Sequence, residues 1–214
     1  MKHLVIYVHG KGGSAEEAGH YGPLFPDAEV IGFDYRAKTP WEAKAEFLSF
    51  FAAQKSRCDR LTLVANSIGA FFSMSSLDET LIGQAFFISP IVDMEQLIGS
   101  MMLWSNVTEQ ELARRLEIPT EFGETLSWEY LLYVRKHPVL WRVSTRILYG
   151  EHDTLTSFET ILAFAKKIGA NLTVMPGGEH WFHTERQLQF LDSWLLDAEN
   201  PGEPDKTAGS TVLI

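Results

Sequence analysis

One ten-residue segment, LTLVANSIGA at positions 61–70, constrains the fold of this chain more than any other. A short apolar run leads to Ser67 and a helix-like pattern follows it, which predicts a strand, a tight turn and a helix with the serine in the turn. Such a turn holds the serine in a sparsely populated backbone conformation and brings the strand and the helix close together. Small residues are therefore required two positions on either side, where the sequence has Ala65 and Gly69. The serine hydroxyl is expected to be exposed at a helix N-terminus, where free N–H groups stabilise negative charge.

Strand-like segments alternate with helical segments on both sides of that turn. Capping-box patterns, in which a threonine is followed three positions later by Glu or Gln, predict helix starts at Thr39, Thr156 and Thr184. This alternation predicts a mostly parallel, doubly wound α/β sheet of about six strands, flanked by helices. The runs expected to form the strands are 4–8, 30–34, 61–65, 85–90, 146–150 and 171–175.

The alternation stops between residues 91 and 142, where the apolar residues follow helical spacing. Because such a segment cannot extend the sheet, we expect it to form a helical cap insertion that lies over the sheet. The helices expected there are 94–102, a segment capped by Thr108-x-x-Glu111, and 128–134.

The domain organisation follows from these patterns. Residues 1–90 and 143–198 are expected to form the α/β core, and residues 91–142 the cap. Residues 199–214 contain two prolines, two glycines and few apolar residues, which predicts a flexible C-terminal tail.

Composition and charge limit the classes of partner. The chain has 214 residues, a formal net charge of −10 and 18 scattered Lys and Arg residues, so we expect no binding to nucleic acid, which needs a basic face. Its single cysteine, Cys58, excludes an internal disulfide. The apolar run at 4–8 is too short for a signal peptide, and no segment approaches the ~20 apolar residues of a membrane span. We therefore expect a cytoplasmic protein, whose oligomeric state the sequence does not specify.

Two polar residues follow predicted strands and are suited to activate the serine. A serine hydroxyl is a poor nucleophile at neutral pH, so a general base must take its proton and a third group must orient that base. In a parallel α/β sheet, the loops at the carboxyl ends of the strands converge on one edge. His180 follows the strand at 171–175 and Asp153 follows the strand at 146–150, which makes them candidates for the base and its partner.

Other residues compete for these roles. Asp93 follows the strand-like run at 85–90 and is the alternative acid. His183 is expected to precede the helix cap at Thr184 and to face the helix start, and His152 is expected to be a surface residue. Because no His-Glu-x-x-His pattern or carboxylate cluster is present, we predict no metal site.

Four segments resemble motifs of the α/β-hydrolase superfamily, and together they span most of the chain. The turn at 65–69 resembles the G-x-S-x-G nucleophile elbow, with Ala in place of the first Gly. The other three are His9-Gly10-Lys11-Gly12-Gly13, which resembles the H-G-x-G-G loop, and the runs 149–153 and 176–180, which resemble the acid and histidine loops.

The resemblance implies a serine hydrolase that needs no cofactor. Ser67 would be the nucleophile, His180 the base and Asp153 the residue that orients it, in the order Ser, acid, His along the chain. The backbone N–H groups of Lys11 and Ile68 would form the oxyanion hole, while His9 braces the loop.

The expected substrate is a small molecule with a carboxylic ester or related acyl bond. The alternatives are a thioesterase or carbon–carbon hydrolase that uses the same residues, and a non-catalytic binding protein with a hydrolase fold. Large apolar side chains of the insertion either bind an apolar acyl or aromatic group or form the core of the cap itself. They are Met101, Met102, Trp104, Trp128, Tyr130 and Trp141.

Overall fold

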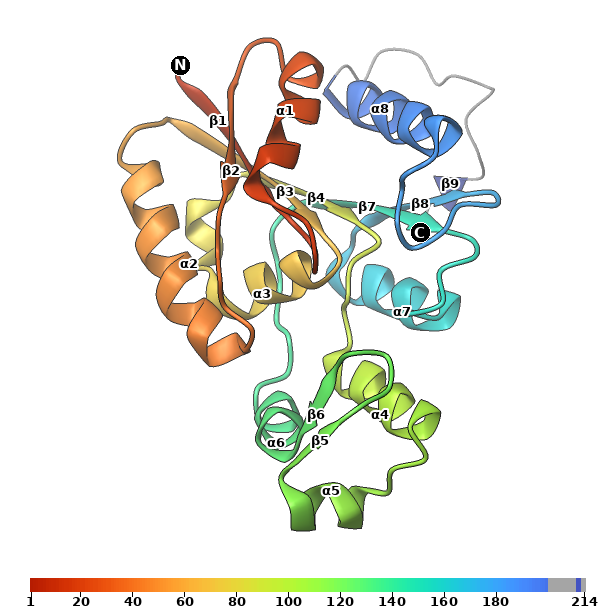
Figure 1. Ribbon diagram of the computed structural model, residues 1–214. Helices are drawn as coiled ribbons and strands as arrows, with labels where there is room; N and C mark the ends of the chain where they lie inside the picture. The colour runs from red at the N-terminus through yellow and green to blue at the C-terminus, as the bar shows by residue number, and fades with distance from the viewer. Residues whose placement is uncertain (200–210, 213–214) are drawn as a thin grey trace. The chain divides into compact units, whose positions relative to one another are not determined.

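The computed structural model describes residues 1–199 and 211–212 of the chain (Figure 1). The chain divides into two compact units, one formed by Met1–Val92 and Trp141–Ile214 and the other by Asp93–Leu140. The first unit carries a large sheet with helices on both faces, and the second consists of helices and a small hairpin.

The first unit is built on a sheet that has seven strands among the described residues, in the order β2-β1-β3-β4-β7-β8-β9. Neighbouring strands are parallel, except that β9 pairs antiparallel with β8. In the register, Val5 of β1 lies opposite Val30 of β2 and Thr62 of β3. The predicted mostly parallel sheet is confirmed, and all six predicted strands occur in it. The bounds are β1 His3–Val8, β2 Glu29–Phe33, β3 Arg60–Asn66, β4 Gln84–Ile88, β7 Thr145–Gly150, β8 Asn171–Met175 and β9 Thr211–Val212.

Helices cover both faces of this sheet, with α1 and α8 on one face and α2, α3 and α7 on the other (Figure 1). The hydroxyls of Thr39 and Thr184 cap α2 and α8, each accepting a backbone N–H at 3.3 Å, as their capping boxes predict. The short helices near β1 were not predicted. The bounds are η1 Ala15–Glu17, α1 Ala18–Tyr21, η2 Gly22–Leu24, α2 Pro40–Lys55, α3 Ile68–Ser76, η3 Glu79–Leu81, α7 Phe158–Ile168 and α8 Glu185–Glu199.

The capping box predicted at Thr156 does not form. The N-cap of α7 is the next residue, Ser157, whose hydroxyl accepts the N–H of Thr160 at 3.2 Å. Thr156 is buried instead, where its N–H donates to Oδ1 of Asp153 at 3.1 Å and its hydroxyl donates to the carbonyl of Pro90 at 3.4 Å. The prediction is wrong because two adjacent hydroxyl residues both suit a helix cap, and tertiary contacts decide between them.

Alternate side chains of the central strands face the two layers of helices. On the α2 and α3 face, the ring of Phe33 packs on Phe47 and Phe50 with centroid distances of 4.9 and 4.1 Å. The rings of Tyr35 and Phe72 are 5.8 Å apart in an edge-to-face arrangement. The core on the α1 and α8 face comprises Val5, Tyr7, Ala18, Tyr21, Leu24, Phe25, Val64, Phe86, Ile88, Leu148, Met175, Phe182, Leu191, Trp194 and Leu195.

The second unit contains the three helices predicted for the insertion and a two-stranded antiparallel hairpin that was not predicted. Each strand of the hairpin has three residues, which is too short to show an alternating pattern in the sequence. Arg135 links the three helices of this unit, because its guanidinium donates to Glu95 at 2.7 Å and to Glu109 at 2.6 Å, each on a different helix from its own. The bounds are α4 Met94–Trp104, α5 Glu109–Arg115, β5 Glu117–Pro119, β6 Thr125–Ser127 and α6 Trp128–Lys136.

The end of the chain is only partly described. The predicted flexible tail at 199–214 lies outside the described residues except for Glu199, which ends α8, and Thr211–Val212, which form β9. Across residues 1–199 and 211–212, no helix combines the length and the apolar character needed to cross a membrane.

The close approach of β1 and α3 makes a prediction for stability. A Cβ atom added at Gly69 would lie 2.4 Å from the carbonyl oxygen of His9 and 2.9 Å from that of Val8, so Gly69→Ala must push the two backbones apart. We expect the free energy of unfolding, measured with urea, to fall by about 2 kcal/mol or more. Gly19→Ala is the matched control, because nothing lies within 4 Å of a Cβ at that position. Equal stability of the two variants would contradict the packing described here.

Candidate active site

Ser67 occupies a sharp turn between β3 and α3, where the sequence predicts it. Its φ of 51° and ψ of −121° lie outside the regions that ordinary residues favour. The neighbouring strand end holds this turn on both sides: the N–H of Ser67 donates to Ile88 at 3.0 Å, and its carbonyl accepts the N–H of Ile91 at 3.2 Å. The strained serine is therefore fixed by the backbone of the adjacent strand end.

A continuous chain of hydrogen bonds links Ser67, His180 and Asp153. Oγ of Ser67 lies 2.8 Å from Nε2 of His180, and Nδ1 of His180 lies 2.7 Å from Oδ2 of Asp153. Because a carboxylate only accepts, Nδ1 carries the proton toward Asp153 and Nε2 is left to accept the serine hydroxyl. The serine hydroxyl is thus hydrogen-bonded to an imidazole whose ring orientation is set by a carboxylate.

Asp153 is held by more than the histidine. Its side chain is completely shielded from solvent, so its oxygens depend on protein donors. Oδ1 accepts the N–H groups of Leu155 and Thr156 at 2.8 and 3.1 Å, which leaves Oδ2 for His180. These bonds orient the carboxylate and compensate for its burial.

The loops that carry Asp153 and His180 are joined by hydrogen bonds. The N–H of His152 donates to the carbonyl of Gly178 at 2.7 Å, and the N–H of Gly177 donates to the Glu151 side chain at 2.8 Å. A Cβ added at Gly150 would lie 2.7 Å from the carbonyl carbon and oxygen of Gly178, so the loops can approach only because Gly150 has no side chain.

The loop after β1 passes beside the serine. A Cβ added at Gly10 would lie 3.1 Å from Cβ of Ser67, which places the predicted oxyanion-loop segment next to the serine. His9 is buried and braces this loop: Nδ1 donates to the Gly10 carbonyl at 2.8 Å, and its ring stacks on Tyr35 at 4.3 Å. Lys11 lies in the same loop, and burial lowers the pKa of its side-chain amine.

The competing residues are engaged elsewhere. Asp93 is the N-cap of α4, and its side chain accepts the N–H of Gln96 at 2.9 Å. His152 is exposed, as predicted for a surface residue. His183 is also exposed and stacks on Trp181, with ring centroids 4.6 Å apart. Within the described part of the chain, no three His, Cys, Asp or Glu side chains are grouped as metal ligands would be.

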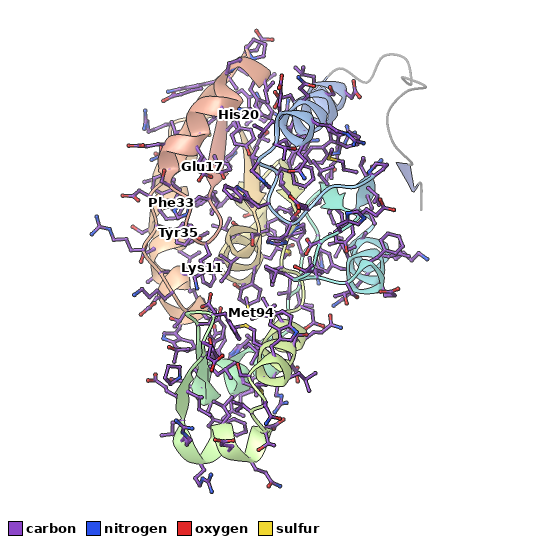
Figure 2. The ribbon with its side chains drawn as sticks, turned by 45° about the vertical axis from the view of Figure 1, so that its right-hand side comes forward. Lys11, Glu17, His20, Phe33, Tyr35 and Met94 are labelled. Atoms are coloured by element: carbon purple, nitrogen blue, oxygen red, sulfur yellow. The ribbon has the colours of Figure 1, made fainter. Side chains whose placement is uncertain are left out.

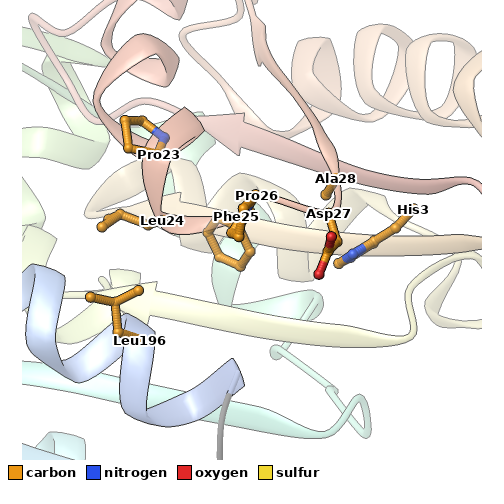
Figure 3. A pocket seen from close by; sticks show the side chains of 8 residues that line it. All are labelled: His3, Pro23, Leu24, Phe25, Pro26, Asp27, Ala28 and Leu196. Atoms are coloured by element: carbon orange, nitrogen blue, oxygen red, sulfur yellow. The ribbon is translucent and has the colours of Figure 1, made fainter.

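A small hollow of about 180 Å³ opens at the other end of the sheet (Figure 3). One of its walls is His3, the first residue of β1, whereas Ser67, Asp153 and His180 follow the carboxyl ends of their strands. In parallel α/β sheets the ligand site lies at the carboxyl ends, so this hollow is separate from the candidate active site.

Three residues near the loop after β1 were assigned no role from the sequence. Tyr7 and Glu17 are hydrogen-bonded to each other, and the hydroxyl of Tyr35 donates to the carbonyl of His9 at 2.9 Å. Glu17 and Tyr35 are labelled in Figure 2. The pattern Ser14-Ala-Glu-Glu17 is a capping-box signature, which could have placed Glu17 against the loop but could not have identified Tyr7 as its partner.

Comparisons with known proteins support the fold. No protein-family model matches the chain, and no curated protein matches it in sequence. Among solved structures, Est1E from Butyrivibrio proteoclasticus with bound ferulic acid is 16% identical, with a TM-score of 0.75 over 92% of this chain and 87% of that one. The alpha/beta hydrolase domain-containing protein 10 from mouse is 14% identical, with a TM-score of 0.72 over 92% of this chain and 90% of its own. A putative hydrolase from Agrobacterium vitis S4 is 14% identical, with a TM-score of 0.69 and coverages of 91% and 87%.

These similarities establish the architecture. The chain has the α/β-hydrolase fold, as the resemblance of its four motifs predicts. Its structural neighbours include esterases and a thioesterase domain, although sequence identity to each is low.

The contact between the acid and histidine loops can be tested at Gly150. In Gly150→Ala the new Cβ would lie 2.4 Å from the carbonyl oxygen of Glu179, so one of the loops must move. We expect a loss of about 1–3 kcal/mol in the free energy of unfolding, measured by chemical denaturation. Gly83→Ala is the control, because its Cβ would meet Leu61 at an ordinary 3.5 Å. A Gly150→Ala variant as stable as this control would show that the loops do not pack as described.

Proposed function

We propose that this protein is a serine hydrolase that cleaves a carboxylic ester, or a related acyl bond, of a small molecule. The observation that supports the proposal is the hydrogen-bonded chain from Ser67 through His180 to Asp153, with distances of 2.8 and 2.7 Å. Separate loops of the sheet contribute these three residues, and the order along the chain is the one found in this fold.

In the proposed reaction, Oγ of Ser67 attacks the carbonyl carbon while its proton passes to Nε2 of His180. The tetrahedral intermediate collapses, the bond to the alcohol breaks, and the alcohol oxygen takes the proton from His180. Water then attacks the acyl-serine with His180 again as the base, releasing the carboxylic acid and restoring the serine. Asp153 keeps Nδ1 protonated and stabilises the imidazolium that forms in each half of the reaction.

The negative charge of the intermediate needs hydrogen-bond donors. We assign this role to the backbone N–H groups of Lys11 and Ile68. Ile68 is the first residue of α3, so its N–H belongs to the helix end that lacks intrahelical acceptors. Gly10 precedes Lys11 and runs beside Ser67, which supports a second donor from that loop. Each donor of this kind typically contributes ~3 kcal/mol to transition-state stabilisation.

The burial of the large apolar residues in the predicted insertion indicates which of them could contact an acyl group. Two of the large apolar residues of the predicted insertion are buried: Met102 in the second unit and Trp141 in the first, where the Trp141 ring packs on Phe87 at 5.6 Å. These two act as core residues, whereas Trp104 is more than half exposed and remains a candidate for substrate contact. Residues 91–142 are retained as a proposed cap.

Two alternatives are kept for specific reasons. A thioesterase would use the same three residues, and one structural neighbour is a thioesterase domain from the curacin biosynthetic pathway, with a TM-score of 0.54. A carbon–carbon hydrolase shares the chemistry as well. A non-catalytic binding protein would not need the nucleophile, base and acid to be retained together, so their juxtaposition favours the enzyme.

The first test is labelling of the protein by a fluorophosphonate, together with turnover of short p-nitrophenyl esters. Ser67→Ala removes the attacking oxygen and should abolish labelling and lower turnover by several orders of magnitude. Ser75→Ala is the matched control, because its hydroxyl only donates to the helix carbonyls of Phe71 and Phe72. A folded native protein that neither labels nor hydrolyses any ester would favour the binding-protein alternative.

The identity of the acid can be tested by comparing two substitutions. Asp153→Asn should lower kcat by roughly three to four orders of magnitude, because the amide favours the wrong tautomer of His180. Asp93→Asn should leave kcat unchanged, since asparagine caps a helix as well as aspartate does. The reverse result would make Asp93 the acid.

A further inference from the structure

A network of polar side chains lies beside the loop after β1, outside the chain formed by Ser67, His180 and Asp153. Tyr7, in β1, is almost fully buried, and its hydroxyl donates to Oε2 of Glu17. Oε1 of the same carboxylate accepts the N–H of Ser14 at 3.2 Å. Glu17 therefore connects the end of β1 to the end of the loop that carries Lys11.

The carboxylate packs directly on the loop backbone. A Cβ added at Gly13 would lie 2.6 Å from Oε1 and 3.1 Å from Oε2 of Glu17. The loop is also closed by a hydrogen bond of 3.2 Å from the N–H of Gly13 to the carbonyl of Gly10. On its other side, Tyr35 holds the carbonyl of His9 at 2.9 Å. The segment from His9 to Gly13 is thus held at both ends by side chains from other elements.

Tyr7 also connects this network to the turn at Ser67. Its hydroxyl lies beside the side chain of Asn66, the residue directly before the serine. Burial, with the nearby Tyr21 and Glu17, raises the pKa of Tyr7, so its hydroxyl stays protonated and can donate to the carboxylate. Asn66 lies close to the loop as well, because a Cβ at Gly10 would be 3.7 Å from its Cγ.

We propose that Glu17 and Tyr7 are positioning residues that fix the Lys11 loop relative to the turn at Ser67, and so fix the spacing of the two oxyanion N–H donors. This inference rests on the proposed function. Neither residue is assigned a contact with the substrate; both act through the backbone of the loop. Donors that stabilise a transition state must be held in place before the charge develops, which is what a network of this kind provides.

The competing explanation is that Glu17 only caps the short helix at 15–17 and that Tyr7 only fills the core. Tyr7→Phe distinguishes the positioning role from this competing explanation, because it keeps the ring and the Ser14–Glu17 bond and removes only the hydroxyl. Glu17→Ala removes both contacts of the carboxylate. Glu17→Gln can keep both, since its amide oxygen accepts from Ser14 and its amide N–H donates to the Tyr7 hydroxyl. Glu16→Ala is the matched control, with the same loss of charge one residue away.

The experiment measures kcat and KM for a p-nitrophenyl ester, and the affinity for phenylboronic acid, which adds to an activated serine as a tetrahedral anion. We expect Tyr7→Phe and Glu17→Ala to lower kcat about tenfold with little change in KM, because the lost interaction acts only in the transition state. Boronate affinity should fall in parallel, whereas Glu17→Gln and Glu16→Ala should stay within about threefold of the native protein.

The possible results separate this inference from the proposed function. If the native protein turns over esters, but Tyr7→Phe and Glu17→Ala match the Glu16→Ala control in kcat and boronate affinity, the inference about the network is overturned and the proposed function stands. A loss confined to KM would also overturn it, because that result indicates ground-state binding. A native protein without turnover or boronate binding would overturn the proposed function, and with it the catalytic role of the network. Glu17 is a surface residue, so Glu17→Ala decides the question even if Tyr7→Phe fails to fold.

Discussion

The strained turn at Ser67 is the feature on which the rest of the site depends. A residue with a φ of 51° and ψ of −121° is costly, on the order of 1–3 kcal/mol, and persists only where the surroundings require it. Two kinds of contact impose it here. Gly69 lies so close to the carbonyls of His9 and Val8 that the first turn of α3 cannot shift toward β1, and β4 holds the serine backbone from the other side. The result is a hydroxyl that projects from a rigid strand–helix junction.

The second requirement is that two loops far apart in the sequence both come together beside the serine. His180 and Asp153 are 27 residues apart, so their hydrogen bond forms only if the two loops that carry them are held together. The meeting point is the backbone contact between Gly150 and Gly178, supported by the bond from His152 to Gly178. Because Asp153 is shielded from solvent and accepts three protein donors, its orientation follows from the packing of these loops, and the orientation of the histidine follows from Asp153.

Most of the fold was predictable because the signals are local. Buried parallel strands are continuous apolar runs, and the six expected ones are all present; the motif order also placed Ser67, Asp153 and His180 at strand ends that converge. The failures concern choices that only tertiary contacts make. Thr156 and Ser157 are equally good caps in sequence, and the burial of Thr156 selects Ser157. Glu17 stays exposed in the fold, and its pairing with the buried Tyr7 could not be predicted, since no sequence pattern marks a pair ten positions apart.

The segment 88–91 connects the turn at Ser67 to the loop that carries Asp153. Ser89 also has a positive φ, 42°, directly after β4 ends, and its N–H donates to Leu148 of β7 at 2.8 Å. Ile88 and Ile91 on either side of it hold the backbone of Ser67, while the carbonyl of Pro90 accepts the hydroxyl of Thr156. Thr156 in turn donates its N–H to Asp153. A path of hydrogen bonds thus runs from the turn at Ser67 through the end of β4 to the loop that carries Asp153, and it includes no contact with His180. The strain at Ser67 and Ser89 is compensated by the same bonds that connect Ser67 to Asp153, so loosening this segment would both relax the turn and displace the carboxylate.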